Sequence, residues 1–370
     1  MVERMSAVLM VAAMLMLVLP ARADDDGPAL AARAPQPMVA LNGFGTLGLT
    51  QSPERRTDYT FDNLQPTGAG RSNELTFYVD TRLGLQLTGH IGDQWSAVVQ
   101  MVSEYRPNGS YEPFISWANV KYAVTPDFSL RLGRISLPSF LESDSRRVGY
   151  SNITARPPIE VYRLLALKES DGVDAAYRWH IDGATNTTTV LYGHAAVTNT
   201  SEVTVHSTKV AGIFDTVEFE RATLHAAYQV RDVDNQRPPL GRFMSLGASY
   251  DPGEWFASSE WVKVVNFSGK GVKATRVGWY VNAGKRFGLF SPYATVSELL
   301  PTTNTGVTPI GQRTFASGVR WDVMRNVDLK AQWDDIRLAD HSYGTLQNTL
   351  PTMPKGGRVN VYSVMADFIF

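Results

Sequence analysis

Strict alternation of apolar and polar side chains dominates this sequence. Residues 74–88 show it best: every second position from Leu75 to Leu87 is apolar or Thr, and the positions between them include Asp80 and Arg82. A period of two residues predicts a β-strand. A register shift of one residue would move the charged side chains to the opposite face of the sheet, so the register is well determined.

The same pattern recurs along most of the chain. We expect about sixteen strands, an even number within the range of bacterial barrels. The predicted strands are residues 39–50, 74–88, 94–106, 113–124, 128–135, 171–180, 185–197, 205–214, 218–231, 242–250, 254–266, 272–287, 290–299, 312–322, 327–338 and 358–370.

The connections between these strands alternate in length. The short ones are residues 89–93, 125–127, 181–184, 251–253 and 323–326. The longer ones are residues 51–73, 136–170, 300–311 and 339–357. Outer-membrane barrels have short periplasmic turns and longer outer loops. The connections therefore favour an all-β fold, a transmembrane antiparallel β-barrel with both termini on the periplasmic side.

The last predicted strand, residues 358–370, has an apolar face that ends in aromatic side chains, as expected for a strand lying against lipid. Aromatic residues also gather beside the short turns and predict one membrane-interface girdle: Trp95, Phe128, Trp179, Trp255, Phe290, Trp321, Phe368 and Phe370. A second girdle is predicted on the long-loop side at Tyr105, Phe114, Trp117 and Tyr228.

A soluble β-sandwich or propeller would also alternate. Alternation alone does not separate these folds from a membrane barrel. The alternating loop lengths, the aromatic terminal strand and the N-terminal segment favour the barrel.

The N-terminal segment has the pattern of a cleaved secretory signal peptide, residues 1–23. Arg4 precedes an apolar run from Ala7 to Leu19, and the small residues before position 24 match an A-x-A cleavage site. The alternative is a single N-terminal anchor, which the shortness of the run disfavours. We expect one domain, residues 24–370, because no linker or shift in composition interrupts it.

Composition excludes several classes of function. The chain has no cysteine, so it can form neither a disulfide nor a thiolate site. Its formal net charge is -1, without the basic excess of a nucleic-acid-binding protein. Neither an H-E-x-x-H nor a G-x-S-x-G motif accompanies its histidines. The sequence therefore predicts no catalytic residue, no cofactor and no metal, and an enzyme built around His225 is the weaker alternative.

Several short segments resemble the Gram-negative porins of the general bacterial porin superfamily. They are residues 132–135 (LGRI), 278–284 (GWYVNAG), 326–333 (NVDLKAQW) and the terminal Phe370. The resemblance implies a homotrimer of sixteen-strand channels in the outer-membrane lipid of a Gram-negative bacterium. It also implies that residues 136–169 are the third outer loop, folded into the pore. This loop lacks the acidic, glycine-containing tip of the classical members, so its constriction is expected to differ.

The inward face of the strands predicts the chemistry of the pore. Arg82, Lys121, Arg131, Arg276 and Arg320 point inward by parity, and Glu142, Asp144 and Glu160 lie on the third loop. A basic wall facing an acidic loop would set up a transverse field. The resemblance to porins implies passive diffusion of ions and small hydrophilic solutes. Because basic residues outnumber acidic ones in this inward set, we expect a weak anion preference. The alternative is that these are ordinary solvated lumen charges.

Further alternatives concern solute specificity and loop anchoring. Tyr78, Tyr280 and Tyr293 face inward by parity, and they either stack on sugars or organic acids in a substrate-specific porin or fill space. Tyr162 is expected to anchor the third loop, and Glu260 is placed inward because lipid disfavours charge. A non-conducting adhesin would need longer outer loops.

Overall fold

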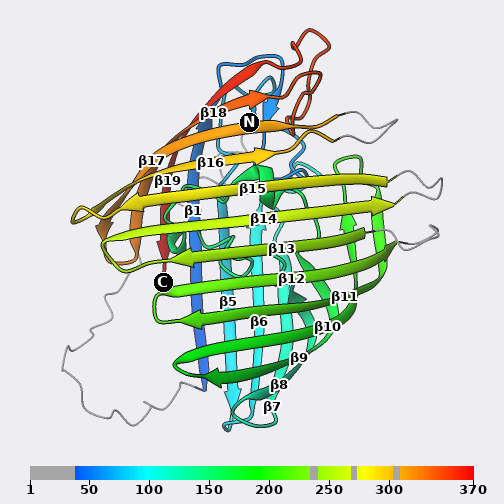
Figure 1. Ribbon diagram of the computed structural model, residues 1–370, viewed down its shortest axis with the longest axis vertical. Helices are drawn as coiled ribbons and strands as arrows, with labels where there is room; N and C mark the ends of the chain where they lie inside the picture. Colours follow the sequence, from blue (N-terminus) through cyan, green and yellow to red (C-terminus); the bar gives the residue numbers. More distant parts are fainter. Residues whose placement is uncertain (1–37, 234–240, 268–272, 303–308) are drawn as a thin grey trace.

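The structure is a computed structural model that describes residues 38–233, 241–267, 273–302 and 309–370. Within these residues, sixteen long strands form a closed antiparallel barrel (Figure 1). The ring closes where β19 pairs with β1, from Phe44 opposite Ile369 to Gln51 opposite Tyr362. The predicted fold class is confirmed. The predicted signal peptide, residues 1–23, lies outside the described residues.

The long strands are β1 (Val39–Gln51), β5 (Arg82–Ile91), β6 (Trp95–Glu104), β7 (Phe114–Ala123), β8 (Phe128–Ser136), β9 (Glu169–Ile181), β10 (Ala184–Thr198), β11 (Thr204–Phe219), β12 (Ala222–Val233), β13 (Gly241–Tyr250), β14 (Trp255–Phe267), β15 (Lys273–Lys285), β16 (Phe290–Leu299), β17 (Gln312–Met324), β18 (Val327–Leu338) and β19 (Arg358–Ile369). The short elements are β2 (Asp58–Tyr59), β3 (Ala69–Gly70), β4 (Leu75–Thr76), a 3-10 turn η1 (Gly149–Ser151) and α2 (Ile159–Tyr162). No helix in this part of the chain is long and apolar enough to cross a membrane.

The two faces of each strand have opposite polarity, as the sequence predicts. In β19, Tyr362 and Val364 are 49% and 57% exposed on the outside, whereas Ser363 and Asp367 are buried inside. An inside lined by carboxylates is tolerated only where water or counter-charges reach it. The barrel is therefore apolar outside and polar inside.

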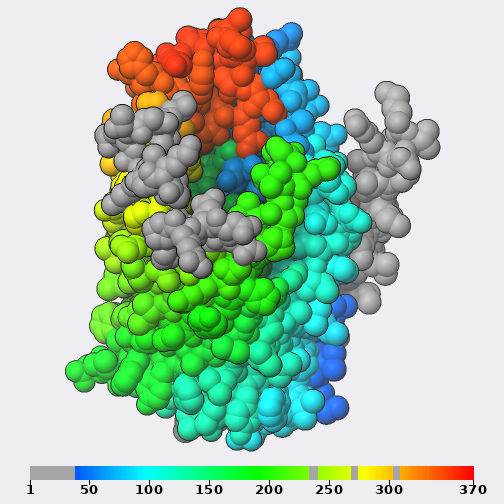
Figure 2. All heavy atoms as spheres, turned by 90° about the vertical axis from the view of Figure 1, so that its right-hand side faces the viewer, coloured from blue at the N-terminus to red at the C-terminus, as the bar shows by residue number. Residues whose placement is uncertain are grey.

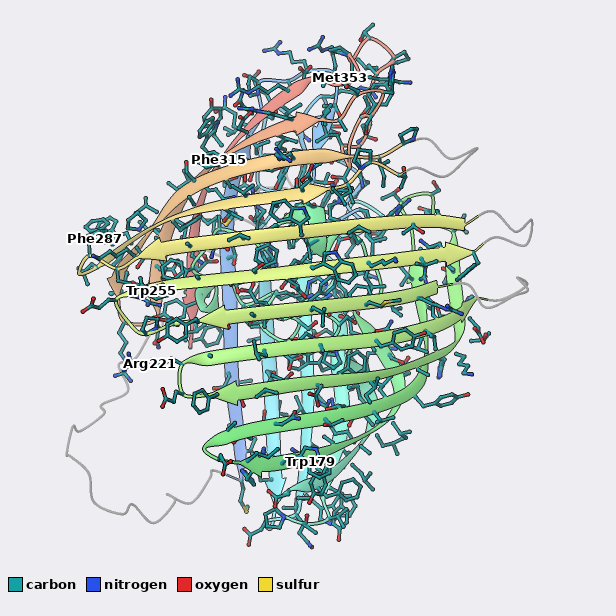
Figure 3. All side chains as sticks on the ribbon, in the orientation of Figure 1. Trp179, Arg221, Trp255, Phe287, Phe315 and Met353 are labelled. Carbon is teal, nitrogen blue, oxygen red and sulfur yellow. The ribbon has the colours of Figure 1, made fainter. Side chains whose placement is uncertain are left out.

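The predicted aromatic girdle beside the short turns is confirmed for its exposed members. Trp179, Trp255 and Phe290 present 45–49% of their surface on the outside of the barrel. Figure 3 shows Trp179 near the bottom of the view, Trp255 at the left edge and Met353 at the top.

The second girdle is only partly confirmed. Tyr228 is exposed on the outside, but Phe114 turns inward, where its ring lies 5.4 Å from the Arg147 guanidinium. A bulge causes the difference, because the β6–β7 register shifts between Gln100 and Met101. Beyond one extra residue in a strand, odd and even positions exchange the faces of the sheet on which they lie.

The strand predicted over residues 74–88 is interrupted. The chain forms only β4, then leaves the ladder at residues 77–81 and resumes in β5. Val79 is 2% exposed in an interior apolar cluster, and Asp80 is 1% exposed. Within the interrupted segment, Arg156 of a distant loop binds the Asp80 carboxylate. Local alternation carries no sign of that contact.

One predicted turn is also misplaced. The sequence suggests strands at 205–214 and 218–231, but β11 continues to Phe219 and the chain reverses at Glu220. Glu220 has φ 48°, the left-handed conformation that tight hairpin turns require. The turn therefore lies later than predicted.

Three loops at the long-loop end fold over or into the barrel: L1 (residues 52–81), L3 (residues 137–168) and L8 (residues 339–357). L1 and L8 pair where Asp58 lies opposite Gln347. L1, L8 and α2 of L3 bury a common apolar cluster against β18 and β19, which includes Tyr59, Ile159, Ile336 and Met353. The outer loops thus form a cap on one half of the barrel and hold L3 inside it.

Candidate functional site

L3 lies inside the barrel and packs first through aromatic side chains. Phe140 stacks on Tyr162 at 4.6 Å and meets Phe243 of β13 edge-on at 5.0 Å. The Leu141 N–H donates a hydrogen bond of 3.0 Å to Glu260 of β14. Both Tyr162 and Glu260 are 1% exposed. The anchoring role predicted for Tyr162 and the inward position predicted for Glu260 are confirmed.

Arg156 ties L3 to the opposite side of the wall. Its Nε and Nη2 donate to the two oxygens of Asp80 at 2.9 and 2.7 Å, and Nη1 lies 3.3 Å from Asp334 of β18. Nη2 also donates to Ser363 of β19 at 2.6 Å. A bidentate arginine–carboxylate pair is among the strongest polar contacts in proteins. Arg156 therefore joins L3, L1 and two wall strands at one buried point.

A second charged contact lies at Gly149. The Lys330 ammonium, which is 1% exposed, donates to the Gly149 carbonyl at 2.7 Å and to Asp367 at 2.9 Å. Arg320, a predicted pore residue, donates to the Tyr150 carbonyl at 2.6 Å. A Cβ added at Gly149 would overlap the Asp367 carboxylate. Only glycine allows L3 to approach the wall this closely.

Glu160, another predicted pore residue, holds α2 against the wall. It is 1% exposed and accepts hydrogen bonds from Ser297 of β16 at 2.7 Å and from Gln312 and Thr314 of β17. Its carboxylate therefore points into the strands and away from the opposite wall. Glu160 therefore anchors α2 to β16 and β17.

The root of L3 carries two further ion pairs. Arg147 lies 3.2 Å from Glu104 of β6 and 2.5 Å from Glu169 of β9. Lys168 lies 2.5 Å from Asp62 of L1. Burial acts to lower the pKa of the Arg147 guanidinium, but Glu104 and Glu169 together raise it above its usual range. This charge is therefore fully neutralised.

These contacts reverse the charge arrangement predicted from the sequence. L3 contains five basic residues, Arg146, Arg147, Arg156, Arg163 and Lys168, against three acidic ones. The wall and L1 supply the acids that pair with them. The prediction of an acidic loop facing a basic wall is therefore wrong at these contacts. Counting all charges of the loop would have revealed its basic excess, but the acidic partners are distant in sequence.

Lys121 and Arg131 lie together on another part of the wall. They are direct neighbours across β7 and β8, and Arg131 faces Asp174 of β9. Arg131 Nη2 lies 2.6 Å from Asp174, which is 3% exposed. No ion-pair or hydrogen-bond partner of the Lys121 ammonium occurs among the described residues. Asp174 was missed by the sequence analysis, although inward parity would have indicated it.

The remaining predicted pore residues are separate. Arg82 lies nearer the long-loop end, 3.9 Å from Asp80. Asp144 is exposed on L3, and Arg276 is half-buried on β15. Glu142 directly follows Leu141, which is anchored to Glu260. Burial raises the pKa of the Glu142 carboxyl to about 7, and the positive charge of Lys330 acts in the opposite direction. Among the eight predicted pore residues, only Lys121 and Arg131 are direct neighbours on adjacent strands.

The inward tyrosines differ in exposure. Tyr280 and Tyr293 are 2% and 5% exposed beneath L3, so they fill space and do not present a face to a solute. Tyr78 stacks on Tyr105 at 4.5 Å near the outer loops. His225, considered as a catalytic base, is 6% exposed and has Nδ1 3.1 Å from the Thr216 hydroxyl. The described residues contain no cluster of three or more groups suited to a metal ion.

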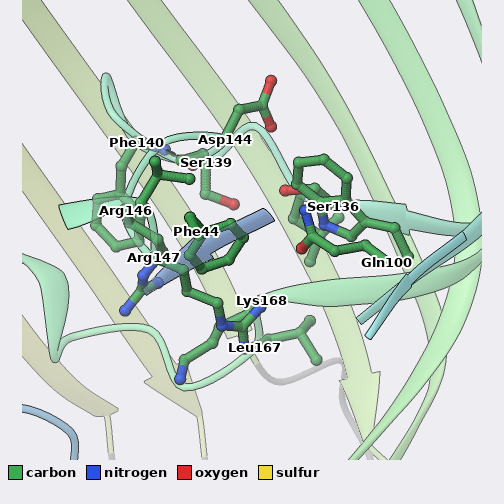
Figure 4. A pocket seen from close by; sticks show the side chains of 14 residues that line it. Phe44, Gln100, Ser136, Ser139, Phe140, Asp144, Arg146, Arg147, Leu167 and Lys168 are labelled. Carbon is green, nitrogen blue, oxygen red and sulfur yellow. Dashed lines mark hydrogen bonds between the residues drawn. The ribbon is translucent and has the colours of Figure 1, made fainter. Parts of the chain in front are cut away.

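A cavity of about 410 Å³ opens at the long-loop end; we call it the mouth chamber. L1, L2 (residues 105–113), L3 and the long-loop ends of β5 to β10 line it. Figure 2 shows this end of the molecule hollowed, with blue atoms of L1 deep in the recess. A smaller pocket lies beside L3, where Arg146, Arg147 and Lys168 lie apart from the Asp144 carboxylate (Figure 4).

This architecture is shared with solved bacterial channels. An anion-selective porin from Comamonas acidovorans superposes with a TM-score of 0.63, covering 90% of this chain and 99% of its own, at 13% identity. The chain has the porin fold. The outer-membrane channel DcaP of Acinetobacter baumannii gives a TM-score of 0.60 at 11% identity, covering 90% of this chain and 97% of the channel.

A variant of the Rh. blastica porin has a TM-score of 0.55 at 15% identity and covers 90% of this chain and all of its own. The porin fold thus accounts for nearly all of the described barrel. No family model matches the sequence, and neither does any curated protein. The resemblance predicted from the sequence is therefore confirmed for the fold.

Proposed function

We propose that the protein is a porin, a water-filled channel for passive diffusion of ions and small hydrophilic solutes. The observation that carries the proposal is the closed barrel with an apolar outside and a charged inside, narrowed by L3. Buried charges such as Asp328 and Lys330 would be costly in a dry core without partners. A barrel interior reached by water and bridged by counter-charges accommodates them.

A weak anion preference is part of the proposal. Three of the five basic residues of L3 are paired with acids of the wall and L1. Among the described residues, the Arg146 guanidinium of L3 and the Lys121 ammonium of β7 have no ion-pair partner, so both leave positive charge inside the barrel. Charges that line a pore raise the local concentration of counter-ions and set selectivity. Replacing Lys121 by Gln should shift the reversal potential in a salt gradient towards cation permeation. Arg313→Gln, on an exposed pair with Glu298, is the control. Equal shifts in both variants would contradict a specific role for Lys121.

The proposed location is the outer membrane of a Gram-negative bacterium, and the proposed assembly is a homotrimer. The apolar outside, the aromatic girdle and the outer-membrane neighbours support the location. The resemblance to porins supports the trimer.

Liposome swelling tests the channel directly. Vesicles containing the refolded protein should swell in solutions of small sugars and amino acids, and the rate should fall steeply with solute size, because L3 narrows the barrel. A matched preparation of heat-denatured protein is the control. Absence of swelling with every solute, including those smaller than glucose, would contradict a diffusion channel.

A substrate-specific porin is the second candidate, and one observation favours it. L3 is fastened to the wall at several buried points, Phe140, Gly149, Arg156 and Glu160. A fixed loop provides the pre-organised surface that selective binding requires.

A further inference from the structure

One buried arginine beside the mouth chamber has no counter-ion in the part of the chain that the structure describes. Arg146 of L3 is 8% exposed and lines the chamber. Among the described residues, no acceptor lies within hydrogen-bond or ion-pair distance of its guanidinium. Its neighbours are aromatic: the guanidinium carbon lies 5.9 Å from the Phe140 ring and 5.8 Å from the Tyr162 ring. Cation–π contacts orient a guanidinium and leave its N–H donors available.

The adjacent residue, by contrast, is paired with acids. Arg147 has two carboxylate partners, Glu104 and Glu169. Asp62, the acid that acts most strongly on Arg146, is instead paired with Lys168 at 2.5 Å. A desolvated charge without a partner is costly, so proteins seldom keep one without a use for it.

A second cation on the same chamber is only partly neutralised. Arg82 is 3.9 Å from Asp80, whose two oxygens are already bound by Arg156. Arg82 Nη1 donates to the Arg146 carbonyl at 3.4 Å, so the two arginines are neighbours. Its guanidinium carbon lies 5.4 Å from the Phe61 ring.

The acids that line the chamber are each paired with a basic side chain, and part of the remaining lining suits the body of a small organic molecule. Phe61, Val79, Phe114 and Ala195 contribute apolar surface to the lining. A cavity of about 410 Å³ falls within the range of small-molecule sites, roughly 300–1,000 Å³, which combine apolar walls with a few convergent polar groups. An inorganic ion would use the charge and leave the apolar wall unused.

We propose that the mouth chamber binds small organic carboxylates, with the carboxylate on Arg146 and Arg82 and the apolar body against Phe61 and Phe114. The site would select solutes above the narrowest part of the barrel. This inference rests on the proposed channel function and names its solute class. The carboxylate site and the channel function can be tested separately, because benzoate binding can be measured without measuring ion conduction.

The test uses benzoate as the probe and benzamide as its uncharged analogue. Calorimetric titration of the refolded, detergent-solubilised full barrel should detect benzoate binding and no benzamide binding. Arg146→Gln should weaken benzoate binding at least about tenfold, the loss expected for one charge-assisted contact. Arg146→Lys should restore part of it. Arg55→Gln, which removes an exposed L1 cation, should leave binding unchanged.

Single-channel recording adds an independent measurement. Benzoate should reduce the chloride current saturably in the wild type and in Arg55→Gln, and only at much higher concentration in Arg146→Gln. Equal benzoate affinity in Arg146→Gln and wild type, equal binding of benzamide, or no benzoate binding at all would overturn the site. Binding lost in Arg146→Gln, with no current in any variant, would support the site and reject the channel.

Discussion

Arg156 gives the sharpest test of how L3 is held. Replacement by Gln keeps much of the side-chain volume but removes the charge that neutralises Asp80 and Asp334, which are 1% and 4% exposed. Removing one partner of a buried ion pair typically costs about 3–5 kcal/mol, because the other charge stays buried without compensation. We expect that loss in the free energy of docking L3 onto the wall. Even about 3 kcal/mol changes the docking equilibrium more than about 100-fold.

Limited proteolysis with chymotrypsin measures this equilibrium, since Phe140 and Tyr162 of L3 are buried cleavage sites. When opening is fast, the cleavage rate follows the population of the open loop. Arg156→Gln should therefore be cut much faster within L3 and should show noisier, larger single-channel currents. Combining Arg156→Gln with Asp80→Asn should recover part of the loss, because it removes an uncompensated carboxylate.

Arg55→Gln is the matched control for Arg156→Gln. Its ion pair with Glu74 is exposed, with 77% and 47% of the two side chains accessible. Such pairs contribute about 0–1 kcal/mol. Wild-type cleavage rates and currents in Arg156→Gln would refute the view that this arginine fastens the loop.

Two further predictions concern L3. Because burial raises the pKa of Glu142 to about 7, its carboxyl is neutral below that pH and charged above it, so anion preference should fall as pH rises from about 6 to 8. The reversal potential of Glu142→Gln should not change over this pH range. If the variant keeps the pH dependence of the wild type, another group is responsible for it. Gly149→Ala should undock L3 at a cost of about 1–3 kcal/mol, because the new Cβ overlaps Asp367. Gly89→Ala should leave L3 docked, because the nearest atom to its added Cβ is 3.8 Å away. Equal rates of proteolysis within L3 in both variants would contradict the close approach of Gly149 to the wall.

The sequence specifies the barrel well because its signal is local. Alternation in β19 places Tyr362 outside and Asp367 inside, and a strand carries that information in itself. The prediction of a continuous strand failed at residues 77–81, where the alternation is regular but the chain leaves the ladder and Val79 is buried in the interior apolar cluster. It also failed at Phe114, where a bulge shifts the register.

The side-chain contacts inside the barrel were harder to predict, because most of them join residues that are far apart in the sequence. Residue parity indicated Lys121 and Arg131 as neighbours on one wall, and the structure places them opposite each other. The partners of L3, such as Glu104 for Arg147 and Ser297 for Glu160, come from strands far along the chain. Their pairing depends on how the loop folds back, which no local pattern records.

Single-channel recording in planar bilayers tests the central claim most directly. The refolded protein without residues 1–23 should insert and produce discrete, ohmic current steps in potassium chloride, with a reversal potential in a salt gradient on the anion-selective side. Protein that stays monodisperse in buffer without bound detergent and produces no current steps would contradict a water-filled membrane barrel.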